Sequence, residues 1–197
     1  MSKTIVIVGG GFSGTMAAVN LARLSTQALR IVIVNTKRPV GRGTAYSTQR
    51  SEHLLNVAAR NMSAFPDFPE HFLSWLRSRS EFATLPEEEL RQMFVPRYVY
   101  GDYLCSLLAA CQHPVDPRNK VEVETIDDEA TDIVVADDGR ASVLLKSGES
   151  LNADQVLLAT GNQPPGSFPS HAPLSHDPRY RSDPWHDWVS RLPGTGG

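Results

Sequence analysis

The sequence contains few of the features that mark several common classes of protein. It has only two cysteines in 197 residues, and no apolar run approaches the length of about 18 residues that a membrane-spanning helix needs. Cys105 and Cys111 form neither a disulfide framework nor a metal motif. Glycines interrupt the first apolar stretch at once, which excludes a signal peptide. We therefore expect a soluble, cytoplasmic protein in a reducing compartment.

An excess of charge of one sign is also missing. The chain has 19 lysines and arginines against 22 acidic residues, which gives a net charge of −3. This balance offers no electrostatic basis for binding nucleic acid or an anionic membrane. The six histidines include no pair with the helical i, i+4 spacing of a metal site around a carboxylate. We expect no metal and no nucleic-acid or membrane partner.

The start of the chain has the pattern of a βαβ unit. Residues 4–8 form a short β-branched run typical of a buried parallel strand, and residues 30–34 form a second one. Between them, residues 14–24 carry small and apolar side chains at helical spacing. Residues 35–68 have no clear period, yet they hold enough apolar residues to argue against disorder. A long aperiodic segment of this kind is usually functional.

The rest of the chain alternates between helical and strand-like patterns. Pro69 can start a helix, Thr84 and Glu87 form a capping-box pattern, and residues 98–111 form an amphipathic helix. Strand-like segments follow from residue 120, with an Asp-Gly turn at 138–139. The predicted fold is α/β, with a Rossmann-like parallel sheet in a domain at residues 1–165. This domain is expected to contain a helical insertion at about 69–112 and an antiparallel β-meander at about 120–150. A Pro/His-rich tail follows at 166–197 and is expected to include one short helix after Asp183.

Three glycines follow the first predicted strand. Gly9, Gly11 and Gly14 give G-x-G-x-x-G, in which the first glycine permits a tight turn, the second lets a pyrophosphate approach, and the third lets helix and strand pack closely. The position after a strand and before a helix is the context that supports dinucleotide binding. Ser13 is not predicted to be a nucleophile, because a G-x-S-x-G nucleophile elbow would need glycine where Thr15 stands. Its hydroxyl is instead predicted to lie near a phosphate, in the first turn of the helix.

The residue that meets the adenosine ribose is expected at the end of the second strand. That position holds Asn35, whereas an acidic residue is usual. An amide can still bond a ribose hydroxyl, although more weakly than a carboxylate. Lys37 and Arg38 follow and are either phosphate ligands or solvated loop cations.

Two further stretches point to a known family. LLATGNQPP at 157–165 resembles the second flavin signature of two-dinucleotide-binding oxidoreductases, in which a strand ends beside the cofactor. GRGTAYSTQRSEHLLNVAARNMSAFPDFPEHFLSWL at 41–76 and VPRYVYGDYL at 95–104 resemble the FAD/NAD(P)-binding family that includes NAD(FAD)-dependent dehydrogenases and the FAD-dependent urate hydroxylase type. The resemblance covers roughly residues 4–188.

That resemblance implies FAD as the bound cofactor and NAD(P)H as the electron donor. Asn35 departs from the usual acid, and Ala58 stands where the family often has proline. No catalytic residue is identified, although Asn56, Arg60, Asn61 and Ser63 either line the flavin or only pack the loop. The predicted cofactor-binding residues are Gly9, Gly10, Gly11, Phe12, Ser13, Gly14, Asn35, Thr36, Arg42, Gly43, Thr160 and Gly161.

The family resemblance also implies a second nucleotide-binding unit after a D-P-W stretch like that at residues 183–185, and this sequence ends at Gly197. The expected function is therefore the FAD-binding domain of an NAD(P)H-linked oxidoreductase, of monooxygenase type or another, without its second unit and of unknown substrate. Three alternatives stay open. One is a plain NAD-binding dehydrogenase domain, the second is a non-catalytic flavin-binding fragment that needs a partner chain, and the third is a degenerate protein that binds nothing.

Overall fold

The computed structural model describes residues 2–36, 39–114, 120–162, 177 and 180. The chain divides into two compact units, Met1–Gly161 and Asn162–Gly197, and every helix and strand described below belongs to the first. The predicted domain boundary at residue 165 and the short helix after Asp183 lie outside the described residues. Among the described residues, no helix combines the length and the hydropathy that crossing a bilayer requires.

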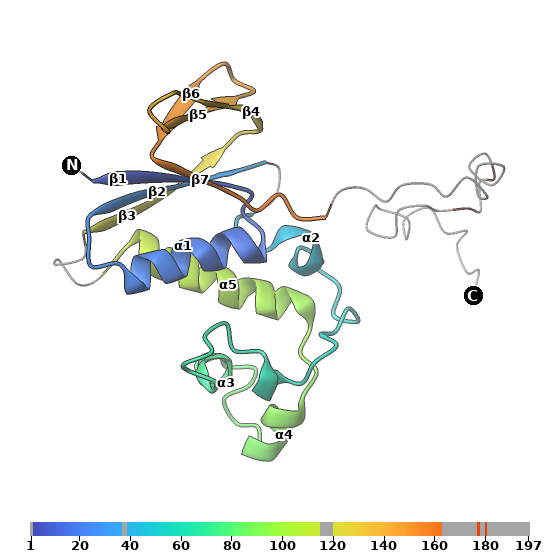
Figure 1. Ribbon diagram of the computed structural model, residues 1–197. Helices are drawn as coiled ribbons and strands as arrows, with labels where there is room; N and C mark the ends of the chain where they lie inside the picture. The colour runs from blue at the N-terminus through green and yellow to red at the C-terminus, as the bar shows by residue number, and fades with distance from the viewer. Residues whose placement is uncertain (1, 37–38, 115–119, 163–176, 178–179, 181–197) are drawn as a thin grey trace. The chain divides into compact units, whose positions relative to one another are not determined.

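A four-stranded parallel sheet forms the centre of the first unit (Figure 1). Its strand order is β3-β2-β1-β7, and each neighbouring pair is parallel. The βαβ start is confirmed, because Ile5 pairs with Ile31 across β1 and β2 while α1 connects the two strands. The elements of this start and the other sheet strands are β1 Lys3–Val8, α1 Phe12–Leu24, β2 Leu29–Asn35, β3 Val121–Asp127 and β7 Gln155–Leu158.

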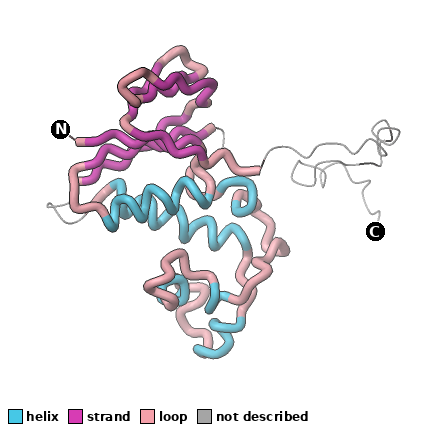
Figure 2. Tube along the Cα trace, viewed as in Figure 1, coloured by secondary structure: helices cyan, strands magenta, loops and turns pink. Residues whose placement is uncertain are grey.

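The two faces of the parallel sheet are covered by different layers (Figure 2). Side chains alternate across a strand, so Ile7 and Ile33 pack with α1 and α5 (Arg97–Gln112) on one face. Val6 and Val32 point the other way and pack with a small antiparallel sheet. All four side chains have no exposed surface. This burial on both faces explains why β1 and β2 read as continuous apolar runs.

The antiparallel sheet has three strands in the order β4-β5-β6, which are β4 Ala130–Val135, β5 Ala141–Leu145 and β6 Ser150–Ala153. The Asp-Gly turn is confirmed, with Gly139 at φ +81° between β4 and β5. The predicted start of this meander at residue 120 is wrong. Residues 121–127 form β3, which pairs with β2 in the parallel sheet. Their alternating pattern arises because β3 is an edge strand that buries Val121 and Val123 next to Leu108 of α5.

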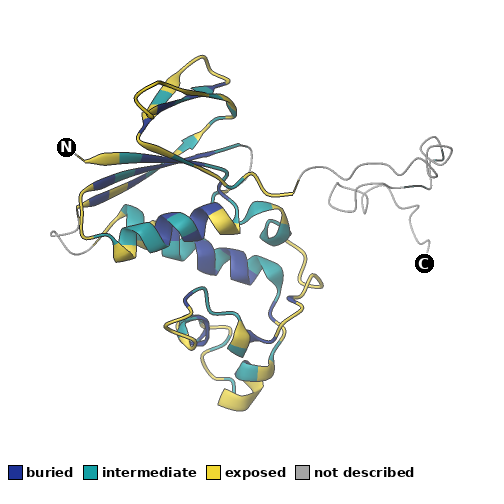
Figure 3. Ribbon diagram, in the orientation of Figure 1, coloured by how far each residue is buried: buried dark blue, intermediate teal, exposed yellow. Residues whose placement is uncertain are grey.

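The helical insertion and α1 share an apolar cluster. Figure 3 shows buried residues on both. Phe72, Leu76, Leu90 and Tyr103 are fully buried there. The predicted capping box is wrong, because α4 has Pro86 at its N-cap and no side-chain cap bond, while Glu87 pairs with Arg77 at 2.9 Å. The helices after β2 are α2 Gly43–Tyr46, the 3-10 helix η1 Ala59–Asn61, α3 His71–Arg77, α4 Glu87–Gln92 and α5 Arg97–Gln112.

His71, which packs against Phe65 and Tyr103 of this cluster, is expected to make the stability of the protein pH-dependent. His71 Nδ1 lies 2.8 Å from the Tyr103 hydroxyl, and burial lowers the pKa of His71 below its ordinary value of 6.5. The unfolded chain therefore binds the proton first as the pH falls, so stability is present above about pH 6.5 and is lost below it. Urea unfolding should give a smaller free energy of unfolding at about pH 5.5 than at about pH 7.5.

The substitution His71→Gln, which cannot titrate, should reduce that difference. The matched control is His53→Gln, because His53 is exposed. An equal pH dependence in wild type and His71→Gln would contradict the prediction.

Candidate cofactor site

The first glycine of the motif turns the chain at the ends of two strands. Gly9 has a φ of +106°, a conformation that favours glycine, and its N–H donates to the carbonyl oxygen of Val34 at 2.8 Å. A Cβ at Gly9 would overlap the carbonyl oxygen of Ala159, just after β7. Gly9 is therefore required by the packing of the chain itself.

The third glycine is required for the same kind of reason. A Cβ at Gly14 would overlap the carbonyl oxygen of Gly9, so only glycine lets the first turn of α1 pack directly against the loop. The next residue, Thr15, is the one buried polar residue of the described core, and its hydroxyl donates to the carbonyl oxygen of Gly10 at 3.3 Å. Thr15 was not among the predicted site residues, although its side chain holds the glycine loop through this bond to Gly10.

The second glycine differs from its neighbours. A Cβ at Gly11 would come no closer than 3.6 Å to any group of the protein, which is ordinary van der Waals contact. Gly11 is the N-cap of α1, where no side chain caps the helix and no acidic residue occupies the first turn. The N-terminal N–H groups of such a helix attract an anion. The protein's own packing thus gives no reason for glycine at position 11, whereas a ligand approaching the backbone would.

Asn35 lies beside the loop at the end of β2. Its Oδ1 accepts a hydrogen bond from the N–H of Gly10 at 2.9 Å. A Cβ at Gly10 would be 2.8 Å from Val40 and 3.0 Å from Asn35, so these side chains hold the loop closely. Asn35 therefore has a structural contact that the sequence did not predict, in addition to its predicted ribose role. Thr36 follows it at an intermediate exposure, and Lys37 and Arg38 lie outside the described residues.

The segment 41–47 lies against the glycine loop. The N–H of Gly41 donates to the carbonyl oxygen of Gly10 at 2.8 Å, and Gly41 and Gly43 have φ values of +102° and +54°. A Cβ at Gly43 would be 3.0 Å from the Cα of Gly11. Two segments that are about 30 residues apart in the sequence are thereby brought together at the same place.

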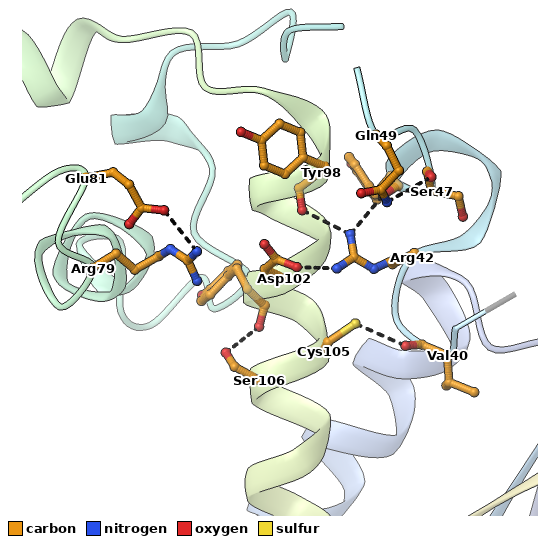
Figure 4. A network of polar contacts seen from close by, with 12 residues as sticks. Val40, Arg42, Ser47, Gln49, Arg79, Glu81, Tyr98, Asp102, Cys105 and Ser106 are labelled. Carbon is orange, nitrogen blue, oxygen red and sulfur yellow. Dashed lines mark hydrogen bonds and ion pairs between the residues drawn. The ribbon is translucent and has the colours of Figure 1, made fainter. Parts of the chain in front are cut away.

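Arg42 fixes this segment to α5 (Figure 4). Its guanidinium forms an ion pair with Asp102 and donates to the carbonyl oxygens of Tyr98 at 3.1 Å and Tyr46 at 3.4 Å. The side chain of Arg42 is only 15% exposed. Its charge is therefore already paired within the protein, and we assign its observed contacts to holding the segment rather than to a ligand.

Helix α5 leaves space for the segment 41–47 at Gly101, which has no side chain. A Cβ at Gly101 would be 2.7 Å from Nη1 of Arg42 and 2.8 Å from the carbonyl oxygen of Tyr46. One turn later, the Cys105 thiol donates to the carbonyl oxygen of Val40 at 3.3 Å. Burial raises the pKa of Cys105, which keeps the thiol protonated and able to donate.

Aromatic side chains complete the contact between α5 and the loop. Tyr100 stacks with Phe12 at a ring separation of 6.5 Å and lies 4.9 Å from the ring of Tyr46. Phe12 itself is 42% exposed, and Ser13 beside it is exposed as well. The predicted residues Phe12 and Ser13 therefore lie at the accessible start of α1.

The end of β7 reaches the same loop. The N–H of Ala159 donates to the carbonyl oxygen of Val8 at 2.8 Å, and Ala159 and Thr160 lie next to Gly9. Thr160 and Gly161 are exposed. Gly161 has a φ of +72°, and a Cβ there would meet no described group of the protein within 4 Å. The structure thus gathers the three glycine-rich segments that the sequence predicted.

The polar loop residues 56–63 are largely used in local packing. The Ser63 hydroxyl donates to the carbonyl oxygen of Phe68 at 2.6 Å, and Arg60 bonds the side chain of Gln92. Asn56 and Asn61 are exposed. Among the described residues no group of three His, Cys, Asp or Glu side chains could hold a metal ion. The described site therefore contains backbone donors and no obvious acid or base.

Comparison with known proteins supports the fold. The chain resembles a cyclohexanone monooxygenase variant from Rhodococcus sp. Phi1 bound to NADP+, at a TM-score of 0.54 and 19% identity over 86% of this chain and 28% of that one. It also resembles OTEMO in complex with FAD and NADP, at a TM-score of 0.50 and 12% identity over 86% and 28%. At these identities the likeness shows the fold alone. The comparison with curated proteins finds no match.

The chain spans 28% of the length of each of these two solved structures. A family described as FAD-NAD(P)-binding matches residues 6–163, which contain the glycine loop, the 41–47 segment and the end of β7. The α/β fold, with its Rossmann-like parallel sheet, is the one that the sequence predicted. The chain belongs to the FAD-NAD(P)-binding family.

Proposed function

We propose that the glycine loop binds the pyrophosphate of FAD and that the chain is the FAD-binding part of an NAD(P)H-linked flavin oxidoreductase. The observation that carries the proposal is the contrast between Gly11 and the other loop glycines. Gly9, Gly10 and Gly14 are each required by neighbouring protein atoms, whereas Gly11 is not. Glycine at that position is explained by a ligand that approaches the backbone.

The residues around the loop supply binding and orientation. The N-terminus of α1 faces the pyrophosphate charge, and the segment 41–47 limits the space above Gly11. Asn35 lies at the strand end where a ribose residue belongs, and Thr160 and Gly161 lie at the strand end that the flavin signature places beside the cofactor. When bound, the flavin supplies the redox chemistry, and the protein supplies position and electrostatics.

Titration of the purified chain with FAD tests the proposal. We expect one FAD per chain, detected by quenching of flavin fluorescence and by a protein-bound flavin absorbance spectrum after gel filtration. NADH, NADPH and AMP serve as competitors. Tight binding of NADH without FAD binding would favour the plain NAD-binding domain, and binding of neither dinucleotide would overturn the proposal.

Substitutions at Asn35 test the ribose contact. Asn35→Ala should weaken FAD by about 0.5–1.5 kcal/mol, the net value of a neutral hydrogen bond. Asn35→Asp should bind FAD at least as tightly as wild type, because a carboxylate accepts from the Gly10 N–H and makes a charge-assisted bond to a ribose hydroxyl. The measurement is the dissociation constant by fluorescence titration. Equal constants for all three proteins would place Asn35 away from the ribose.

The link to NAD(P)H is tested separately on the FAD-loaded chain. Hydride transfer needs the reacting atoms about 3–3.5 Å apart, so a nicotinamide must be held beside the flavin. Anaerobic stopped-flow measures bleaching of the flavin absorbance against NADH or NADPH concentration. We expect slow, non-saturating reduction by the 197-residue chain, and a faster rate when a chain with a nicotinamide-binding domain is added. Fast, saturable reduction would show that this chain holds the reductant itself.

A further inference from the structure

A second region of the unit has the form of a small-molecule site. A cavity of about 430 Å³ opens between the later turns of α1, the later turns of α5 and the segment that leads into α3. This volume lies within the range of about 300–1,000 Å³ that is typical of small-molecule sites. Its walls are mostly apolar and include Val19, Phe65, Phe68 and Leu107.

The cavity is separate from the glycine loop. Val19 lies five residues after Gly14 on α1, which at about 1.5 Å per residue places it at least one helical turn from the loop. None of the glycines or of the residues 41–47 contributes to its lining. A ligand in this cavity would therefore leave the proposed FAD site accessible.

The charges at the cavity are balanced by one another. The Arg23 guanidinium bonds both carboxylate oxygens of Asp67, at 2.6 and 3.1 Å, and lies 5.0 Å from the ring centre of Phe65 and 5.9 Å from that of Phe68. The arginine is thus paired with a carboxylate and stacked on two aromatic rings. A charged ligand would find no uncompensated charge there, so the lining favours an uncharged one.

His71 gives the cavity a polar anchor. The Tyr103 hydroxyl accepts the Ala64 N–H at 3.4 Å and lies 2.8 Å from His71 Nδ1. In the tautomer whose Nδ1 accepts the Tyr103 hydroxyl hydrogen, the imidazole proton lies on Nε2, and this is the tautomer that the proposal uses. Burial lowers the pKa of His71 and keeps the ring neutral. Among the described residues no hydrogen bond uses Nε2.

We propose that this cavity binds an uncharged aromatic molecule that carries one hydrogen-bond acceptor, such as a ketone, with His71 Nε2–H as the donor. The aromatic body would pack against Phe65 and Phe68, and 55% of Phe68 is exposed and free to contact it. The acceptor of the ligand would bond to His71 Nε2–H. Among the side chains that line the cavity, the other donors are Arg23, which is already paired, and the thiol of Cys111, which is a weak donor.

The test uses the full chain and the neutral fluorescent probe N-phenyl-1-naphthylamine. Its fluorescence should rise saturably with one site per chain, equally with and without excess FAD. Ala110 lines the cavity and its neighbour Ala109 does not, while both are exposed on α5. Ala110→Trp should weaken the probe by about tenfold or more because it fills the cavity, whereas Ala109→Trp should leave its affinity unchanged.

Two displacing ligands of nearly equal shape test the anchor. We expect 2-acetylnaphthalene to displace the probe about two- to tenfold more effectively than 2-ethylnaphthalene, the range that one net hydrogen bond provides. His71→Phe should remove that preference; both displacers are compared on the same variant, so a change in its probe affinity does not enter the comparison. The proposal is overturned if wild type shows no saturable binding, if Ala110→Trp binds as Ala109→Trp does, or if both displacers act equally on wild type. None of these results depends on whether FAD binds.

Discussion

Replacing Gly11 with alanine is expected to remove most FAD binding while the fold stays intact. Gly11 has φ −76° and ψ −165°, which alanine adopts without strain. The added methyl would meet no protein atom closer than 3.6 Å, so the free energy of unfolding should change by less than about 1 kcal/mol. The methyl would instead occupy the space of the pyrophosphate. An overlap costing about 1–3 kcal/mol weakens binding by about five- to 150-fold.

Gly14→Ala is the matched comparison, because its methyl meets the protein and not the ligand. The new Cβ would overlap the carbonyl oxygen of Gly9, so stability should fall by about 1–3 kcal/mol or more. Thermal melts and FAD titrations of both variants separate the two roles. If Gly11→Ala retains wild-type FAD affinity, its glycine has no ligand role and the proposed function loses its main support.

The sequence predicted the parts of the fold that depend on local pattern. The apolar runs at 4–8 and 30–34 are typical of buried strands, and the glycines after the first run predict a tight turn before a helix. The structure confirms both. The glycine motif, the 41–47 segment and the end of β7 were each recognised separately. Their convergence follows from the parallel sheet, because the carboxyl ends of β1, β2 and β7 share one edge.

The errors concern partners that are distant in the sequence. An alternating strand such as residues 121–127 fits a hairpin or the edge of a parallel sheet equally well, and only the helix packed over Val121 and Val123 decides between them. The pairing of Arg42 with Asp102 spans 60 residues. One local signal was present and was not used: Gly101 lies inside an amphipathic helix, where glycine costs about 1 kcal/mol and usually has a packing reason.

Gly101→Ala should therefore destabilise the protein even though alanine is the better helix former. Propensity alone predicts a gain of about 1 kcal/mol. The new Cβ would instead be 2.7 Å from Nη1 of Arg42 and 2.8 Å from the carbonyl oxygen of Tyr46, and the latter is backbone that cannot rotate away. We expect a net loss of about 1–3 kcal/mol in the free energy of unfolding. FAD should also bind more weakly, because the displaced segment carries Gly43 against Gly11.

The expected mechanism has a specific readout in the amide hydrogen exchange of Gly41, whose N–H donates to Gly10. In Gly101→Ala this amide should exchange faster, while the amides of β1 and β2 change only with global stability. Ala109→Gly on the exposed side of the same helix provides the control: it should cost about 1 kcal/mol through helix propensity and leave both the Gly41 amide and FAD affinity unchanged. A stabilised Gly101→Ala protein with normal FAD affinity would show that the segment does not depend on the space that this glycine leaves in α5.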